Sequence, residues 1–354
     1  MERTSVIGIG MINRLGNTAD EVWDNLIKGN VQQWPKGKTE YPSVLSSRAQ
    51  RRMNRYSDMS VNAVSRALED AGIDVKKDID PYRIGTIFST GYGAMESNLI
   101  FSDSVLDGDP DLCSPTVFAN TVSNACIGHI CINFGCKGVS TVVMGSNSVG
   151  YSQMLISKGD ADYVLTGAVE EYNEDLFTCF EKNPWAAGSD LAEATVGLLL
   201  SKDSTDSYCD LIDFVECDLG AYPLINKVED KNVAIVERVL KDFVEKQKTP
   251  IDGVICANNG TYFDEVENTV LKNIFGEDML YANQLKKYSG ENLGSSISMS
   301  IAIGAMCLKH KMIPKGITEK GIEGRDIHTI LITGYDVTGN YVAYLMSGSE
   351  NKGN

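Results

Sequence analysis

Ser146 lies at a predicted turn between a strand and a helix. It follows the buried run 139–144, which predicts a strand, and precedes the stretch 147–158, whose apolar spacing predicts a helix. A serine hydroxyl in such a place acts as a nucleophile only when a base lies beside it. Serine at the start of a helix more often caps the helix, and Ser148 suits that use as well. The sequence therefore favours a cap over an acyl-accepting nucleophile.

Cysteine and histidine give little sign of another catalytic centre. The chain has nine cysteines without a CxxC pair, which argues against a disulfide framework and a zinc site, so we expect most of them to be buried. The three histidines are His129, His310 and His328, and each is expected to be structural or exposed rather than catalytic. The short Gly8-x-Gly10 motif lacks the third glycine and the helix start that dinucleotide binding needs.

Composition excludes several classes of function. The chain has 354 residues with 32 basic and 48 acidic side chains, and its net charge of -16 would repel a nucleic-acid backbone. No apolar run reaches the length of a membrane span, and the first residues lack the pattern of a signal peptide, so we expect a cytoplasmic protein. The length favours two domains or two fused halves.

Short β-branched runs alternate with amphipathic helical patterns along the chain, which is typical of an α/β fold. The pattern restarts after about residue 210, so we predict two similar halves, 1–210 and 211–354, with a parallel core. Strands are predicted at 5–10, 84–89, 139–144, 163–168, 196–200, 211–215, 253–257, 328–333 and 341–346. Helices are predicted at 61–71, 147–158, 233–245, 265–275 and 293–309.

Several motifs, in order and spacing, resemble those of the β-ketoacyl synthases. They include the opening VIGIGMINRLGN and the later segments RIGTIFSTGYG, SPTVFANTVSNACIGH and ANNGT, at residues 6–17, 83–93, 114–129 and 257–261. The resemblance implies a thiolase-like, five-layered αβαβα fold of two fused βαβαβ-type halves. It also implies an obligate dimer whose active-site pockets meet the interface.

The resemblance identifies three altered positions. In that family a cysteine takes an acyl chain from acyl carrier protein, and two histidines assist decarboxylation of malonyl units and stabilise the oxyanion. Here Ser146 stands at the cysteine position, Asn259 at the first histidine and Glu291 at the second, while the family's lysine is kept as Lys286. The glycine-rich gating loop is also lost at 335–340. No catalytic set is intact.

Glu291 admits two interpretations. It can act as a base, or it can pair with Lys286 five residues earlier as a buried ion pair, and the ion pair is favoured. A carboxylate at this position also places negative charge where the family needs a neutral donor for an oxyanion. Ketosynthase chemistry is therefore disfavoured.

Two further sets of residues correspond to functional regions of the family. Tyr92 stands where family members line or close the acyl pocket, and Val117 and Phe118 match the segment that crosses the dimer interface; plain interface packing is the alternative. Basic residues between 47 and 55 match a segment that helps dock the carrier protein, although a solvated helix face is the other interpretation. The basic residues are Arg48, Arg51, Arg52 and Arg55.

The resemblance therefore predicts a non-catalytic partner of the chain-length-factor type. Such a subunit would dimerise with an active ketosynthase, meet acyl carrier protein directly or through that partner, and need no cofactor or metal. Chain-length factors commonly carry glutamine at the cysteine position, so a decarboxylase role is not expected for Ser146. The alternatives are an acyltransferase or hydrolase using Ser146 with Glu291 or Asn259, and a homodimeric acyl-chain binder.

Overall fold

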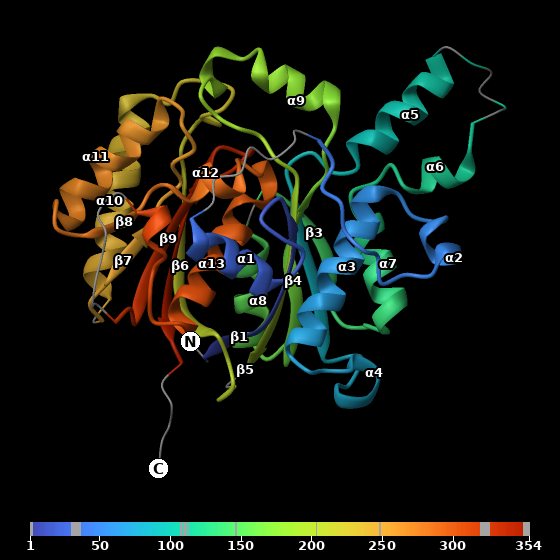
Figure 1. The fold of residues 1–354 in the computed structure, drawn as a ribbon, viewed down its shortest axis with the longest axis horizontal. Helices are drawn as coiled ribbons and strands as arrows, with labels where there is room; N and C mark the ends of the chain where they lie inside the picture. Colours follow the sequence, from blue (N-terminus) through green and yellow to red (C-terminus); the bar gives the residue numbers. More distant parts are fainter. Residues whose placement is uncertain are drawn as a thin grey trace.

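The structure is a computed structural model that describes residues 3–29, 37–106, 108, 111, 113–145, 147–202, 204–247, 249–318 and 326–349. Ten strands form one sheet in the order β3-β2-β4-β5-β1-β6-β10-β9-β7-β8 (Figure 1). The strands are β1 (Thr4–Asn13), β2 (Ile84–Thr90), β3 (Ser140–Met144), β4 (Tyr163–Glu170), β5 (Ala194–Lys202), β6 (Cys209–Asp218), β7 (Gly253–Ile255), β8 (Leu280–Ala282), β9 (Thr329–Tyr335) and β10 (Asn340–Gly348). Each strand predicted from the sequence overlaps one of these.

The strand order repeats in mirror image. Strands β3-β2-β4-β5-β1 have the same sequence-relative order as β8-β7-β9-β10-β6, and the two sets meet where β1 pairs with β6 over Thr4–Val6. A division at residues 210 and 211 stays a prediction. Because β6 begins at Cys209, that boundary lies inside a strand.

The expectation of a parallel core was wrong in part. Strand β2 runs parallel to β3 and β4, and β7 runs parallel to β8 and β9, but the other neighbours in the sheet are antiparallel. Helices cover both faces, so even the antiparallel strands β1 and β5 are buried on both sides and read as unbroken apolar runs. Such runs report burial and carry no information on strand direction.

The two halves of the sheet form two β layers, and helices outside and between them bring the total to the five layers of the thiolase-like fold (Figure 1). Helices α3 (Arg55–Asp70) and α7 (Ala125–Phe134) cover one outer face, and α10 (Asp230–Lys246) and α11 (Phe263–Phe275) cover the other. Between the halves lie α8 (Ser148–Ser157) and α13 (Ser296–Lys309). The small residues of α13 allow this close packing, since a Cβ at Gly304 would lie 2.7 Å from the Ile332 side chain.

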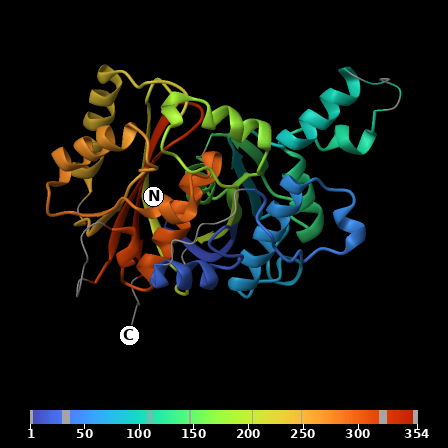
Figure 2. The same ribbon diagram turned by 45° about the horizontal axis from the view of Figure 1, so that its top comes forward.

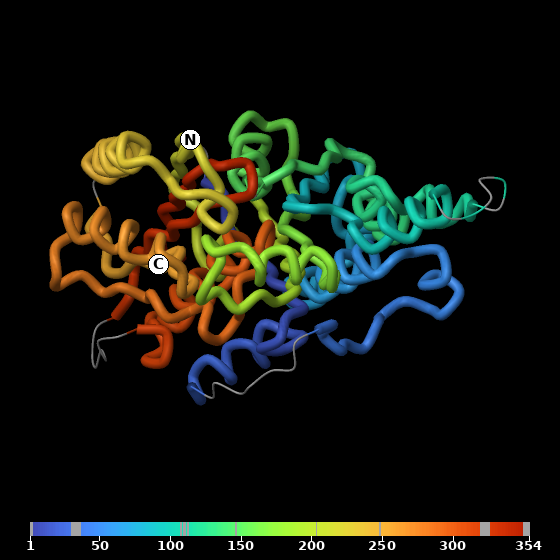
Figure 3. Tube along the Cα trace, turned by 90° about the horizontal axis from the view of Figure 1, so that it is seen from above, coloured from blue at the N-terminus to red at the C-terminus, as the bar shows by residue number. Residues whose placement is uncertain are grey.

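Several helices had not been predicted from the sequence. The longest of them are α5 (Met95–Leu106), α1 (Ala19–Lys28) and α7, and the others are α2 (Ser47–Gln50), α4 (Val75–Asp78), α6 (Pro115–Ala119), α9 (Glu174–Glu181) and α12 (Leu285–Ser289). Helices α5 and α6 form an arm that extends from one end of the molecule (Figures 2 and 3). Helix α5 buries only Ser97, so its sequence has no apolar stripe from which a helix could be predicted. None of the helices in the described ranges is both long and apolar enough to cross a bilayer.

The candidate active-site region

Asn259, Lys286 and Glu291 meet in one buried hydrogen-bonded network. The Lys286 Nζ lies 2.7 Å from Glu291 Oε2, and Asn259 Nδ2 donates to the same oxygen over 2.8 Å. The other oxygen, Oε1, accepts from the Ser296 hydroxyl at 2.5 Å and from the Leu293 amide at 2.8 Å. The predicted ion pair is therefore present, and the carboxylate has four donors.

The surroundings of Glu291 keep it charged. Burial alone would raise its pKa, but the Lys286 ammonium and the hydrogen bonds from Lys286, Ser296 and Asn259 outweigh burial and lower the pKa below its usual value. Only 2% of Glu291 is exposed. A carboxylate that is sealed and fully hydrogen-bonded cannot accept a substrate proton, so this geometry disfavours Glu291 as a general base.

Local backbone features position Glu291. Gly290 ends α12 with a φ of 75°, in the left-handed region that glycine adopts without strain. The Glu291 backbone then pairs with the segment before β5: its amide donates to Asp190 O at 2.8 Å, and its carbonyl accepts from Ala192 at 3.0 Å. Leu293 has a φ of 48°, which turns its amide back to the Glu291 carboxylate. The chain thus folds around this one side chain.

Asn259 is also engaged on its other side. Its Nδ2 donates to the Tyr335 hydroxyl at 2.7 Å, and its Oδ1 accepts from Thr261 Oγ1 at 2.9 Å. The Tyr335 ring contacts Phe263 and Tyr222 at centroid distances of 5.2 and 6.0 Å. Aromatic side chains therefore pack directly against the position at which the family has its first histidine.

The altered loop 335–340 adds a second carboxylate. A Cβ on Gly145, at the end of β3, would lie 2.6 Å from Asp336 Oδ2, so this carboxylate covers the turn directly before Ser146. Asp336 Oδ1 accepts from the Thr338 amide at 2.9 Å and from its hydroxyl at 2.5 Å. The loop thus presents a fixed polar turn with negative charge beside the strand-to-helix connection.

The start of α8 differs from the predicted cap. Asn147 is the N-cap residue, and its side chain bonds to Glu216 and Tyr344 rather than to the helix amides. Ser148 is the first helical residue and donates to Gly167 O on β4 at 2.8 Å, so the expectation that Ser148 caps the helix was wrong. The Ser148 hydroxyl therefore binds a strand carbonyl and not a helix amide. Ser146 lies outside the described residues, and both interpretations of it stay predictions.

The predicted gate residues lie in two different settings. Tyr92 is half-buried in the turn after β2, and its ring makes an edge contact with Phe180 of α9 at 5.7 Å between centroids. Phe118 on α6 is 60% exposed and contacts Phe101 of α5 at 5.2 Å, next to a half-buried Val117. The structure does not bring the Tyr92 and Phe118 rings into contact with each other.

The arginine segment divides in two. Arg48, Arg51 and Arg52 are exposed, and none of them joins an ion pair within the part of the chain that the structure describes. Arg55 turns inward and pairs with the buried Glu193. Three free guanidinium groups therefore remain on the surface beside α2.

Histidines and cysteines take the places expected of structural residues. His310 stacks on Trp23 at 4.4 Å, His129 is half-buried, and His328 is exposed. The hydrogen bonds of Glu291 include no histidine. Five of the nine cysteines are buried, and burial raises the pKa of Cys126 and Cys136 to about 11, which keeps these thiols protonated.

Two buried acids at the end of β4 were missed by the sequence reasoning. Glu170 Oε2 accepts from the amides of Gly91 at 2.7 Å and Gly294 at 3.1 Å, and Oε1 accepts from the Tyr92 amide at 3.0 Å. Glu171 accepts from the Glu96 amide at 3.0 Å. Both side chains are at most 2% exposed. Their only sequence signal is a pair of acidic residues directly after an apolar strand.

Burial raises the pKa of Glu170 to about 8 and that of Glu171 to about 7, although backbone amides oppose the shift. The folded chain then holds protons that the unfolded chain releases near pH 4.5. We expect the free energy of unfolding to fall as pH rises from 5 to 7, by about 1.4 kcal/mol per pH unit for each carboxyl still protonated in the fold. Urea unfolding at several pH values measures this slope. The variant Glu170→Gln should flatten it, and an identical slope in both proteins would contradict the assignment.

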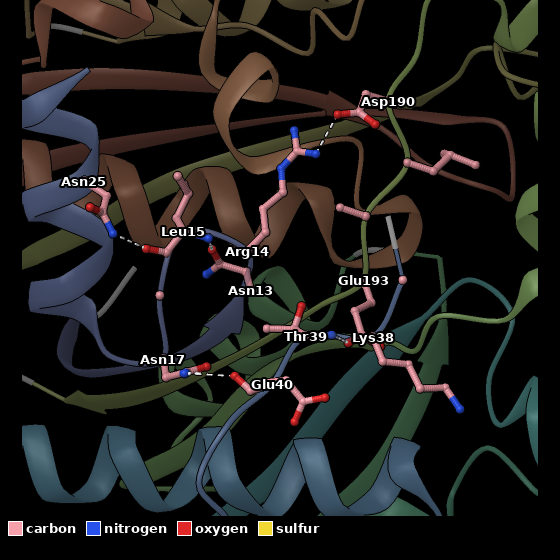
Figure 4. A pocket seen from close by; sticks show the side chains of 14 residues that line it. Asn13, Arg14, Leu15, Asn17, Asn25, Lys38, Thr39, Glu40, Asp190 and Glu193 are labelled. Carbon is pink, nitrogen blue, oxygen red and sulfur yellow. Dashed lines mark hydrogen bonds and ion pairs between the residues drawn. The ribbon is translucent and has the colours of Figure 1, made fainter. Parts of the chain in front are cut away.

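A cavity of about 430 Å³ lies next to this region but does not contain the network. Figure 4 shows its lining, in which the Arg14 guanidinium pairs with Asp190 at 2.5 Å. The segment Asp190–Glu193 lines the cavity, and its backbone also pairs with the backbone of Glu291. Asn259, Lys286 and Glu291 do not line it.

Part of the sequence is similar to known β-ketoacyl synthases. Residues 40–190 match the family described as "Beta-ketoacyl synthase, N-terminal domain". A curated relative, 3-oxoacyl-[acyl-carrier-protein] synthase 2 of Staphylococcus aureus, is 27% identical over 190 residues, which cover 48% of this chain and 46% of that protein. The match thus spans about half the length of this relative.

Solved structures share the fold over nearly the whole chain. A β-ketoacyl synthase from Burkholderia phymatum aligns with a TM-score of 0.83 at 17% identity, covering 98% of this chain and all of that one. A ketosynthase in complex with its chain length factor from Xenorhabdus doucetiae aligns with a TM-score of 0.77 at 15% identity, covering 98% of each chain. These structures give the chain the thiolase-like fold that the ketosynthases share.

Proposed function

We propose that this chain is a non-catalytic, ketosynthase-like subunit of the chain-length-factor type. It dimerises with an active ketosynthase and shapes the tunnel that holds the growing acyl or polyketide chain. The observation that carries the proposal is the Glu291 carboxylate, which occupies a former histidine position and is sealed by four donors. A fixed negative charge there opposes an oxyanion, so the site favours a structural role.

An exposed apolar face supports the dimer. Strand β3 is an edge of the sheet, and no other strand in the described ranges pairs with its outer side. Unpaired edges with apolar surroundings favour association with another chain. Large apolar side chains that are 38–79% exposed lie on β3, α7, α8 and the arm: Met144, Ile132, Met154, Ile100, Leu106 and Phe118. An active ketosynthase, itself of this fold, is the partner proposed for that face.

Carrier-protein docking is the second part of the proposal. Arg48, Arg51 and Arg52 are exposed, form no ion pair with another described residue, and lie in a chain whose net charge is -16, so they form a local basic patch. Guanidinium groups bind carboxylate and phosphate well. The acidic acyl carrier protein is the partner that the resemblance suggests for this patch.

The chain-length role is tested in the reconstituted heterodimer. Phe118→Ala or Tyr92→Ala should shift products toward more extension cycles without abolishing catalysis, because removing a ring opens volume that close-packed neighbours cannot refill. Product length is read by mass spectrometry, and gel filtration checks assembly. Unchanged lengths from both variants, with assembly intact, would make these rings interface packing only.

A second experiment separates this proposal from the serine-enzyme alternative. Ser146→Ala should leave product formation by the heterodimer nearly unchanged, since a capping or packing serine affects stability by only about 0.5–2 kcal/mol. The geometry supports this expectation, because Glu291 accepts hydrogen bonds from both Asn259 and Lys286 and is not free to act as a base. A stable acyl adduct on Ser146, detected by mass spectrometry, would favour the acyltransferase or hydrolase instead.

A further inference from the structure

Glu170 connects two chain segments that are about 200 residues apart in sequence. Its Oε1 accepts from the Tyr92 amide at 3.0 Å, and Oε2 accepts from the amides of Gly91 at 2.7 Å and Gly294 at 3.1 Å. The two glycines lie against each other, because a Cβ on Gly294 would sit 2.2 Å from the Gly91 nitrogen. One buried carboxyl group therefore holds the turn after β2 against the loop after α12.

The two segments carry the residues that matter most in the proposed function. The first holds Tyr92, and the second begins at Glu291, whose carboxylate accepts from Leu293 at 2.8 Å, one residue before Gly294. The Thr90 hydroxyl closes the turn by accepting from the Gly93 amide at 2.9 Å. The Tyr92 amide itself is held by Glu170, which lies outside this turn.

We propose that Glu170 is the positioning residue of Tyr92, fixing its ring at the wall of the acyl tunnel and linking that wall to the loop that carries Glu291. The inference rests on the proposed function for the tunnel itself. The anchoring of the turn is independent of the proposed function, because it follows from the hydrogen bonds within this chain. The two parts can therefore be tested separately.

Glu170→Gln is the informative variant because it preserves shape. Because burial raises the pKa of Glu170 to about 8, hydrogen exchange is compared above pH 8, where the ionised Glu170 has two acceptor oxygens. The glutamine side chain has one acceptor oxygen, so in either orientation its NH₂ group faces an amide N–H, that of Tyr92 or those of Gly91 and Gly294. Glu267→Gln is the matched control, since Glu267 is also 2% exposed and accepts from Ala257, Thr333 and Tyr341 away from this turn.

Hydrogen exchange in the chain alone tests the anchoring. Glu170→Gln should speed exchange by about tenfold or more in peptides covering Thr90–Gly93 or Gly294, while Glu267→Gln leaves those peptides unchanged. Equal exchange in the wild-type chain and Glu170→Gln, or an equal increase in both variants, overturns the inference.

Product length in the heterodimer tests the consequence. Glu170→Gln should lengthen products by at least one extension cycle, and the double variant with Tyr92→Ala should match Tyr92→Ala alone, because Glu170 acts through Tyr92. Additive effects, or longer products from Tyr92→Ala but not from Glu170→Gln, overturn the positioning role. A third outcome is faster exchange in Glu170→Gln with unchanged product lengths in both Glu170→Gln and Tyr92→Ala. That result supports the anchoring of the turn and contradicts the assignment of Tyr92 to the tunnel wall.

Discussion

The isolated chain should form no β-ketoacyl product from acyl and malonyl carrier proteins. The resemblance places Ser146, Asn259 and Glu291 at the positions where the family has a thiol and two histidines. Loss of a catalytic set of this kind lowers turnover by at least about 10³-fold. The assay follows product by mass spectrometry, with an intact ketosynthase as the positive control.

Ser146→Cys alone should not restore turnover. The new thiol would lie next to Gly145, which the Asp336 carboxylate covers, and the Glu291 charge would still oppose an oxyanion. Turnover by the unmodified chain at the rate of a normal ketosynthase would refute the non-catalytic proposal.

Lys286→Met should destabilise the fold by about 3–5 kcal/mol at pH 7. The substitution leaves the Glu291 carboxylate buried without its counter-ion, although Asn259, Ser296 and Leu293 still donate to it. The loss should shrink as pH falls, because Glu291 without Lys286 takes up a proton more readily than in the wild-type chain. Urea unfolding at pH 5 and pH 7 measures both effects.

Lys287→Met is the matched control for this experiment. Lys287 lies on the same helix but is exposed, so its loss should change the free energy of unfolding by at most about 0.5 kcal/mol. If the two variants unfolded at the same urea concentration, the Lys286–Glu291 pair would contribute little to stability.

The sequence pattern predicted an α/β fold because long buried strands and amphipathic helices leave a periodic signal, whereas the five layers were predicted from the family resemblance. Helix α10, for example, runs over Asp230–Lys246 where 233–245 was expected. Helix α5 was missed, since it buries only Ser97 and its apolar residues do not gather on one face. Strand direction in β1 and β5 was hidden because burial on both faces gives the same pattern for either direction.

The site was predictable only where residues near in sequence interact. Lys286 and Glu291 are five residues apart across one short helix, so their pairing was foreseen. The Asn259–Tyr335 bond spans 76 residues, and the Glu170–Gly294 bond spans 124. Neither is visible in a local pattern, because each depends on how loops from separate strands meet at one end of the sheet.

The junction between the halves has a consequence for how the protein is made. Strand β1 is synthesised before both of its neighbours, since Thr4 pairs with Lys202 on one side and with Leu211 on the other. On the ribosome it therefore has neither partner until about 200 further residues have been made. Such long-range pairing slows folding and leaves an apolar edge open to aggregation, so this chain is expected to depend more than most on slow translation or chaperones.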